Sequence, residues 1–200
     1  MQQIMHPRER LHFGKKSLGL WLHTTNRQGS LIRAFTHDQK PIAFNHYPPQ
    51  DYVSKNRQIQ YFYHSHRNNG EHGHIHIYLK DSPSAKPLHF IAIGLSNRGL
   101  PISLFTVSSS SIHERLPRLT EITSLAKILH ETHSQEEAIG LWITSFCLFY
   151  QDAIQTLIEQ KHFKEADPSS GLEITSLKII NWSDDLDQAE ADADCISTQD

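Results

Sequence analysis

The sequence predicts an α+β fold, in which a mainly antiparallel sheet of about four to five strands with a central His-rich hairpin packs against N-terminal and C-terminal helices. Two observations predict it. Apolar residues recur at helical spacing near both ends of the chain, whereas the middle holds short apolar runs separated by turn residues. Helices that bracket a run of strands are typical of α+β architectures.

The N-terminal part predicts two helical elements. Leu18, Trp21 and Leu22 share one helical face within residues 17–25. Gln28, Gly29 and Ser30 interrupt that pattern, and a second apolar element begins at Leu31. Residues 45–49 contain two consecutive prolines and are expected to be rigid and non-helical.

The middle of the chain predicts the sheet. Asn69-Gly70 is typical of a type I′ turn, and it separates two runs with strand composition. Pro101 can begin a strand but cannot continue one in the interior of a sheet. The expected strands cover residues 58–66, 71–79, 88–95 and 102–107, with one more edge strand at 172–180.

Two C-terminal helices are expected. An apolar stripe from Leu119 to Leu129 follows Pro117, and Ser134 with Glu137 forms a capping box. That box opens a long helix whose apolar stripe runs from Ile139 to Leu157, and Pro168 and Gly171 are expected to end it.

Length and charge predict one domain over residues 1–182 and an acidic tail over 183–200. The tail has seven acids and no Lys or Arg, and because it offers little apolar surface it is expected to be disordered. The whole chain has a net charge of −3, so the remainder carries +4, which is too little to indicate a nucleic-acid partner.

Compartment and membrane contact follow from what the chain lacks. Two cysteines provide no disulfide framework, the first residues lack a signal-peptide core, and the apolar stretch at 138–150 is too short to span a bilayer. The expectation is a cytoplasmic protein without a membrane partner.

Histidine is the unusual residue type, with fifteen in the chain and five within residues 64–76. Side chains two positions apart share one face of a strand, so imidazoles at this spacing can converge on one ion. His46 and His89 could join this group, but each of them, taken singly, is interpreted as structural. The candidate metal ligands are His64, His66, His72, His74 and His76.

The hairpin turn decides which imidazoles meet. A strict two-residue turn places Asn68 opposite Glu71, and it is the preferred expectation. It groups His64 and His66 with Glu71 on one face and puts the other three imidazoles on the opposite face. In that arrangement Ile75 and Ile77 are expected to form the apolar wall of the site that contains Glu71. A bulged turn, shifted by one residue, would bring all five imidazoles to one face.

The predicted function is divalent-metal binding, with zinc, iron or manganese as candidate ions. Glu71 is the candidate catalytic residue, since its carboxylate could act as a base. Hydrolytic or oxidative chemistry on a small-molecule substrate would use such a site, although the sequence leaves open whether the chain is an enzyme.

Two alternatives remain. The segment His72-Gly73-His74-Ile75-His76 resembles the histidine triad of nucleotide hydrolases and transferases, a resemblance that implies metal-free phosphoester chemistry with His74 as nucleophile. A non-enzymatic interaction module, with Tyr61 and Tyr63 on its binding face, is the other.

A broader resemblance covers residues 21–181. The ordered blocks resemble an uncharacterised bacterial family of unknown function, which implies no activity. They are His46-Tyr47-Pro48-Pro49, Gln60 to His66, Gly70 to His76, His89 to Ile93, and Gly99 to Thr106.

Overall fold

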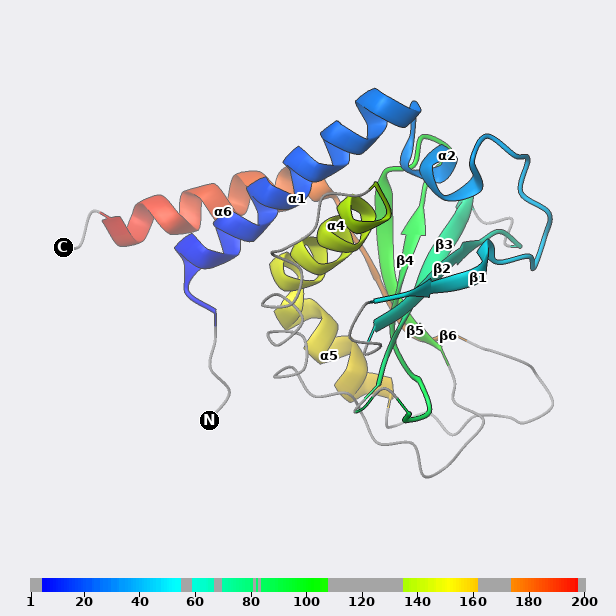
Figure 1. The fold of residues 1–200 in the computed structure, drawn as a ribbon. Coiled ribbons are helices and arrows are strands. Elements are labelled where there is room, and N and C mark those ends of the chain that lie inside the picture. The colour runs from blue at the N-terminus through cyan, green and yellow to red at the C-terminus, as the bar shows by residue number, and fades with distance from the viewer. Residues whose placement is uncertain are drawn as a thin grey trace.

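A computed structural model gives the fold, which contains a six-stranded sheet and helices from both ends of the chain (Figure 1). It describes residues 5–54, 59–66, 70–80, 82, 84–107, 135–161 and 174–197. The expected helical stripe at 119–129, the first residue of the capping box and the helix-ending Pro168 and Gly171 lie outside these ranges. In chain order the elements are α1 (Pro7–Gln28), α2 (Leu31–Thr36), β1 (Tyr47–Val53), β2 (Ile59–His64), β3 (Gly73–Leu79), β4 (Leu88–Leu95), β5 (Pro101–Val107), α4 (Gln135–Phe149), α5 (Gln151–Lys161), β6 (Ile174–Ile179) and α6 (Trp182–Ser197).

The sheet is antiparallel throughout, and each strand pairs with its neighbour in the sequence, in the order β1-β2-β3-β4-β5-β6. The predicted α+β class is therefore confirmed. The strand that the sequence did not predict is β1, which contains Pro48 and Pro49. Because β1 lies at the edge of the sheet, its missing backbone donors do not interrupt an internal ladder.

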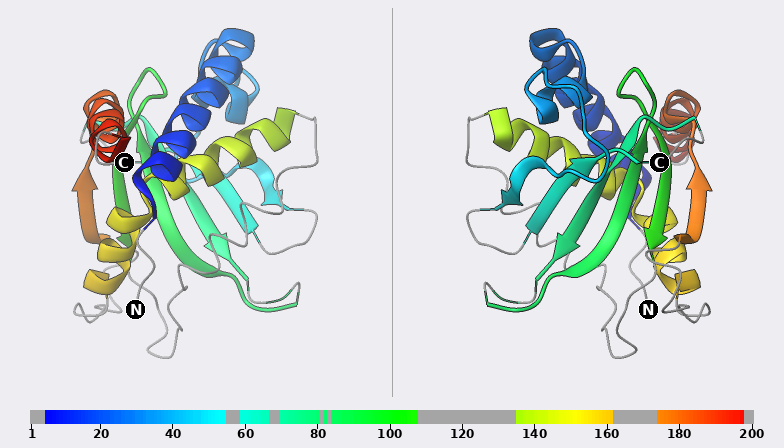
Figure 2. Two further views of the ribbon diagram at one scale, coloured as in Figure 1. Left: turned by 90° about the vertical axis from the view of Figure 1, so that its left-hand side faces the viewer. Right: turned by 90° about the vertical axis from the view of Figure 1, so that its right-hand side faces the viewer.

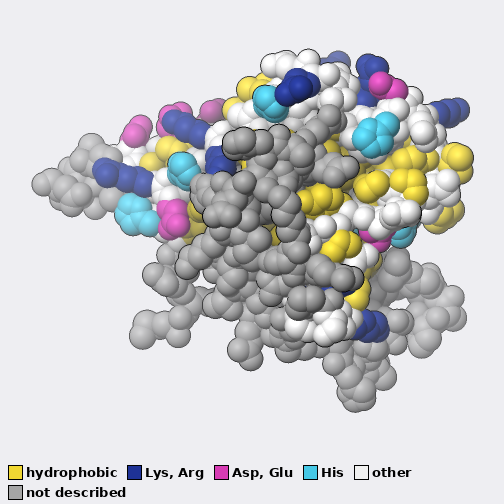
Figure 3. All heavy atoms as spheres, in the orientation of Figure 1, with side chains coloured by type: hydrophobic (Ala, Val, Ile, Leu, Met, Phe, Trp, Pro, Cys, Tyr) yellow, Lys and Arg dark blue, Asp and Glu magenta, His cyan; other side chains and the backbone are white. Residues whose placement is uncertain are grey.

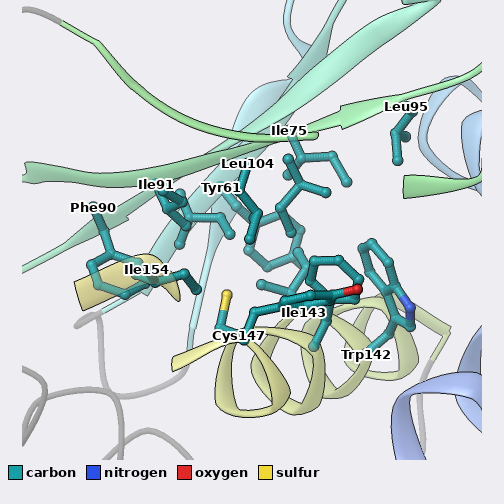
Figure 4. Close-up of a cluster of buried hydrophobic side chains, with 14 of the residues drawn as sticks. Tyr61, Ile75, Phe90, Ile91, Leu95, Leu104, Trp142, Ile143, Cys147 and Ile154 are labelled. Atoms are coloured by element: carbon teal, nitrogen blue, oxygen red, sulfur yellow. The ribbon is translucent and has the colours of Figure 1, made fainter. Parts of the chain in front are cut away.

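The helices α1, α4 and α5 lie on one side of the twisted sheet (Figures 1 and 2). Between them and the sheet is the main core, in which strand residues such as Tyr61, Ile75 and Ile91 face Trp142 and Cys147 of α4 (Figure 4). All five are at most 3% exposed. None of the helices in the described part of the chain is long and apolar enough to cross a bilayer.

Capping residues define the ends of the two N-terminal helices. The His6 side chain accepts a hydrogen bond from the backbone N–H of Arg8, and Pro7 occupies the first turn of α1, where no backbone donor is needed. Gly29 ends α1 with φ of +81°, a conformation that favours glycine. Ser30 then caps α2 by accepting from the backbone N–H of Arg33.

The long C-terminal helix of the prediction is two helices, α4 and α5, which meet at Tyr150. The Tyr150 hydroxyl donates a hydrogen bond to Asp185 of α6 at 2.7 Å. The pKa of the Tyr150 phenol is raised, first by burial and second by the hydrogen bond to Asp185.

The prediction of a disordered tail is wrong for residues 183–197, which belong to helix α6. Ala189 and Ala193 stand four residues apart, so they lie on the same face of the helix, and both are buried. They form a narrow apolar stripe, and the acidic residues lie on the rest of the helix surface. The acidic residues meet α1: Lys15 Nζ lies 2.7 Å from Glu190, and Arg10 lies 3.6 Å from Asp192. Contact with α1 supplies the buried surface that the segment lacks by itself.

The substitution Ala189→Asp is expected to release α6, because Ala189 is 1% exposed and a carboxylate there would lose its hydration. We expect a destabilisation of about 3 kcal/mol, measured by chemical denaturation. Ala191→Asp is the matched control, since Ala191 lies on the exposed side of the same helix. Equal effects of the two substitutions would contradict the packing of α6.

Candidate metal centre

The pairing of β2 with β3 sets the geometry of the site. His64 lies opposite His74, and Tyr63 lies opposite Ile75. The preferred expectation, with His64 opposite Ile75, is wrong by one residue, and the bulged alternative describes the pairing better. The apolar faces explain the outcome, because this register puts Tyr63, Ile75 and Ile77 together in the helix-covered core. The expectation that Ile75 and Ile77 wall the metal site is therefore also wrong.

The opposite face of the sheet carries a cross-strand row of polar residues and glycine. His64 of β2 pairs with His74 of β3, which pairs with Gly94 of β4, which pairs with Ser103 of β5. His64, His74 and Ser103 are each at most 8% exposed. The sheet thus gathers these side chains on one buried face.

Three imidazoles converge on this face. The ligand nitrogens of His64, His66 and His74 all lie within 4.8 Å of one another. The Nε2 atoms of His64 and His74 are 2.6 Å apart. His66 is the exposed member, and its ring stacks on Phe44 with centroids 4.8 Å apart. Phe44 and Ile42, which precede β1, are exposed apolar side chains. Figure 3 shows hydrophobic side chains at the surface on the right of the view, where Figure 1 draws β1 and the loop before it.

Glu71 orients His74. Its Oε1 lies 2.5 Å from His74 Nδ1, and both residues are buried. When Nδ1–H donates to a carboxylate, the lone pair of the ring is on Nε2, the atom that faces His64. A Cβ atom on Gly94 would lie 2.6 Å from Glu71 Oε2 and 2.2 Å from Ser103 Oγ, so the space that Glu71 occupies depends on glycine at position 94.

His76 lies beside the triad but has another partner. Its ring centroid is 4.8 Å from those of both His64 and His74, whereas its Nδ1 lies 2.9 Å from Nε2 of His89. Phe62 and Phe105 pack against the His76 ring. The predicted ligand His76 therefore shares the face of the triad without joining the group of converging nitrogens.

His72 is the predicted ligand that the structure separates from the others. It precedes β3, and its Nδ1 lies 2.5 Å from the hydroxyl of Tyr63, a residue of the helix-covered core. Burial lowers the pKa of His72 and raises that of Tyr63. The histidines at 72, 74 and 76 thus do not converge as a triad. Tyr61 and Tyr63 are 2% and 0% exposed, so the expectation that they form an exposed binding face is wrong.

The buried imidazoles of His64 and His76 are held in their neutral form. Burial, followed by the neighbouring His74, His66 and His46 rings, lowers the pKa of His64 from 6.5 to about 3. Burial and then His89 lower the pKa of His76 well below its usual value. Neutral imidazoles are the form that binds metal ions, so these rings are available as ligands at neutral pH.

The metal-free protein is expected to lose stability as the pH falls below about 6.5, the ordinary pKa of histidine. The unfolded chain then binds protons that the folded His64 and His76 do not bind, and each such ring lowers the free energy of unfolding by at most about 1.4 kcal/mol per pH unit. Urea denaturation between pH 7.5 and 5 measures this slope. Replacing both rings with Gln should flatten it, and an unchanged slope would contradict the neutral cluster.

Five residues around the triad were not among the predicted site residues: His46, Asp51, His89, Gly94 and Ser103. His46 and His89 were visible as histidines, but their placement beside the triad depends on pairings that no local pattern specifies. His46 precedes β1, the strand that was not predicted. Gly94 sits in an apolar run and carries no signal of its contact with Glu71.

The comparison with protein families gives one match. The family described as Domain of unknown function (DUF6969) matches residues 15–171, which contain β1 to β5 and every histidine of the site. The resemblance to an uncharacterised family is thereby confirmed. No curated protein and no solved structure matches the chain.

Proposed function

We propose that this chain, which belongs to the family of unknown function matched above, binds a divalent transition-metal ion through His64, His66 and His74. The observation that carries the proposal is the convergence of three imidazole nitrogens within 4.8 Å of one another. Nitrogens bound to one ion at about 2 Å each lie roughly 3 to 4 Å apart, so small side-chain shifts suffice for coordination.

The surroundings suit a cation. The Nε2 atoms of His64 and His74 approach to 2.6 Å, a contact in which one ring must donate and the other accept. An ion between them would satisfy both lone pairs. Glu71 supplies negative charge behind His74 and holds its tautomer, as carboxylates behind metal-binding histidines commonly do. Zinc, iron and manganese all accept such ligands.

The arrangement leaves room for chemistry on a small molecule. Three protein ligands leave at least one position of the ion open, and exposed His66 marks the side on which solvent reaches the site. We propose hydrolytic or oxidative use of that position. Glu71, whose Oε1 is already on His74, acts in this proposal as a positioning residue rather than as the base.

Thermal melting of chelator-stripped protein, with zinc, iron(II) or manganese added, tests the proposal. An ion that binds only the folded state should raise the melting temperature in a concentration-dependent manner. The double substitution His64→Gln and His66→Gln should abolish the rise, whereas His23→Gln, on the exposed surface of α1, should leave it intact. No rise with any of the three ions, or a rise that survives the double substitution, would contradict the proposal.

A further inference from the structure

His46 lies next to the triad in the same cross-strand row. Tyr47 of β1 pairs with Tyr63 of β2, so the preceding residue, His46, lies beside His64. The two ring centroids are 5.9 Å apart. Two imidazoles bound to one ion at about 2 Å each have centroids roughly 4 to 6.5 Å apart. The rings of the triad, at 4.4 to 5.0 Å, and the His46–His64 pair all fall in that range.

A carboxylate orients the His46 ring, as Glu71 orients the His74 ring. Its Nδ1 lies 2.7 Å from Asp51 Oδ1, and the other oxygen of Asp51 accepts a hydrogen bond from the Gln60 amide at 2.7 Å. A carboxylate on Nδ1 favours the tautomer whose lone pair is on Nε2. The face of the ring stacks on Phe62, with centroids 3.6 Å apart and planes within 11°. Carboxylate and aromatic contacts together fix both the plane and the free nitrogen.

The backbone of β1 is shaped to place Asp51. The register of β1 against β2 shifts between Tyr47 and Tyr52, and Asp51 within this irregular stretch has φ of +51°, in the left-handed region that most non-glycine residues avoid and Asp tolerates. Bulges next to functional sites commonly redirect a side chain. Here the redirected side chain is the carboxylate that holds His46. His76, which also lies near the triad, has an imidazole partner instead, because its Nδ1 lies 2.9 Å from Nε2 of His89.

We propose that His46, positioned by Asp51, is a fourth imidazole ligand of the ion. The proposal rests on the proposed metal site, and it requires a shift of the ring toward His64, because the His46 nitrogen is outside the group that already converges. The His46 side chain is 40% exposed, so a small shift that keeps the contacts with Asp51 and Phe62 meets solvent rather than packed protein on its open side. With four protein ligands, only an ion that accepts more than four, such as iron or manganese, keeps positions open for a substrate.

X-ray absorption and cobalt(II) titration of the full chain test the inference. The wild type loaded with cobalt should show four imidazoles, and His46→Ala should show three, with an affinity at least about 10-fold weaker in competition with a chelator. Asp51→Asn should weaken the affinity in the same direction, and His37→Ala, an exposed histidine on the loop after α2, should not.

The outcomes separate the two proposals. A wild-type protein that binds no cobalt contradicts the metal site and the fourth ligand together. Bound cobalt with three imidazoles in the wild type, or equal affinity and spectra in wild type and His46→Ala, overturns the role of His46 alone.

Discussion

The substitution His74→Ala is expected to reduce metal affinity by more than about 100-fold, because it removes a ligand together with the contact by which Glu71 orients that ligand. His74 is 1% exposed and is the member of the triad that contacts both His64 and Glu71. Competition between the protein and a colorimetric chelator for zinc measures the change.

The control for this experiment is His23→Ala, which removes an exposed imidazole from α1 and should leave the affinity unchanged. Circular dichroism of both variants checks that the fold is retained. If a folded His74→Ala protein binds zinc as tightly as the wild type, the ion is held elsewhere and the assignment of the triad is wrong.

The substitution Gly94→Ala is expected to damage the site more than the fold. The new Cβ would meet Glu71 Oε2 at 2.6 Å and Ser103 Oγ at 2.2 Å, and both are ends of side chains that can rotate away. A Glu71 carboxylate that moves away no longer orients His74. We therefore expect a loss of about 10- to 100-fold in zinc affinity, measured in the same chelator competition.

Gly19→Ala is the matched control for Gly94→Ala. A Cβ at Gly19 would meet nothing within 4 Å, and alanine is preferred over glycine within a helix such as α1. That variant should keep the wild-type affinity and gain slightly in stability. If Gly94→Ala binds zinc as the wild type does, then the position of Glu71 does not matter for the site.

The fold class and most strands could be predicted because periodicity is local. Alternating side chains and the Asn69-Gly70 turn locate β2 and β3, and the long apolar run locates β4. The register of the hairpin could not be predicted from the turn residues alone. It depends on which apolar set packs against helices that come from elsewhere in the chain, and a shift of one residue reverses every side chain.

The other differences between the sequence-based predictions and the structure also arise from long-range contacts. The small apolar surface of the acidic segment by itself predicts disorder. The segment forms α6 because α1 supplies both an apolar surface and the basic partners Arg10 and Lys15. The site was recognised through its histidines. His46 was not assigned to it, because its proximity to His64 depends on the pairing of β1.

Elemental analysis of the untagged wild-type protein, purified without chelators, tests the central claim most directly. The structure places three imidazole nitrogens where one ion can bind them. We expect close to one equivalent of zinc, iron or manganese per chain, lost on substitution of His64 and His74. Less than about a tenth of an equivalent, together with no uptake when these ions are supplied, would contradict the claim.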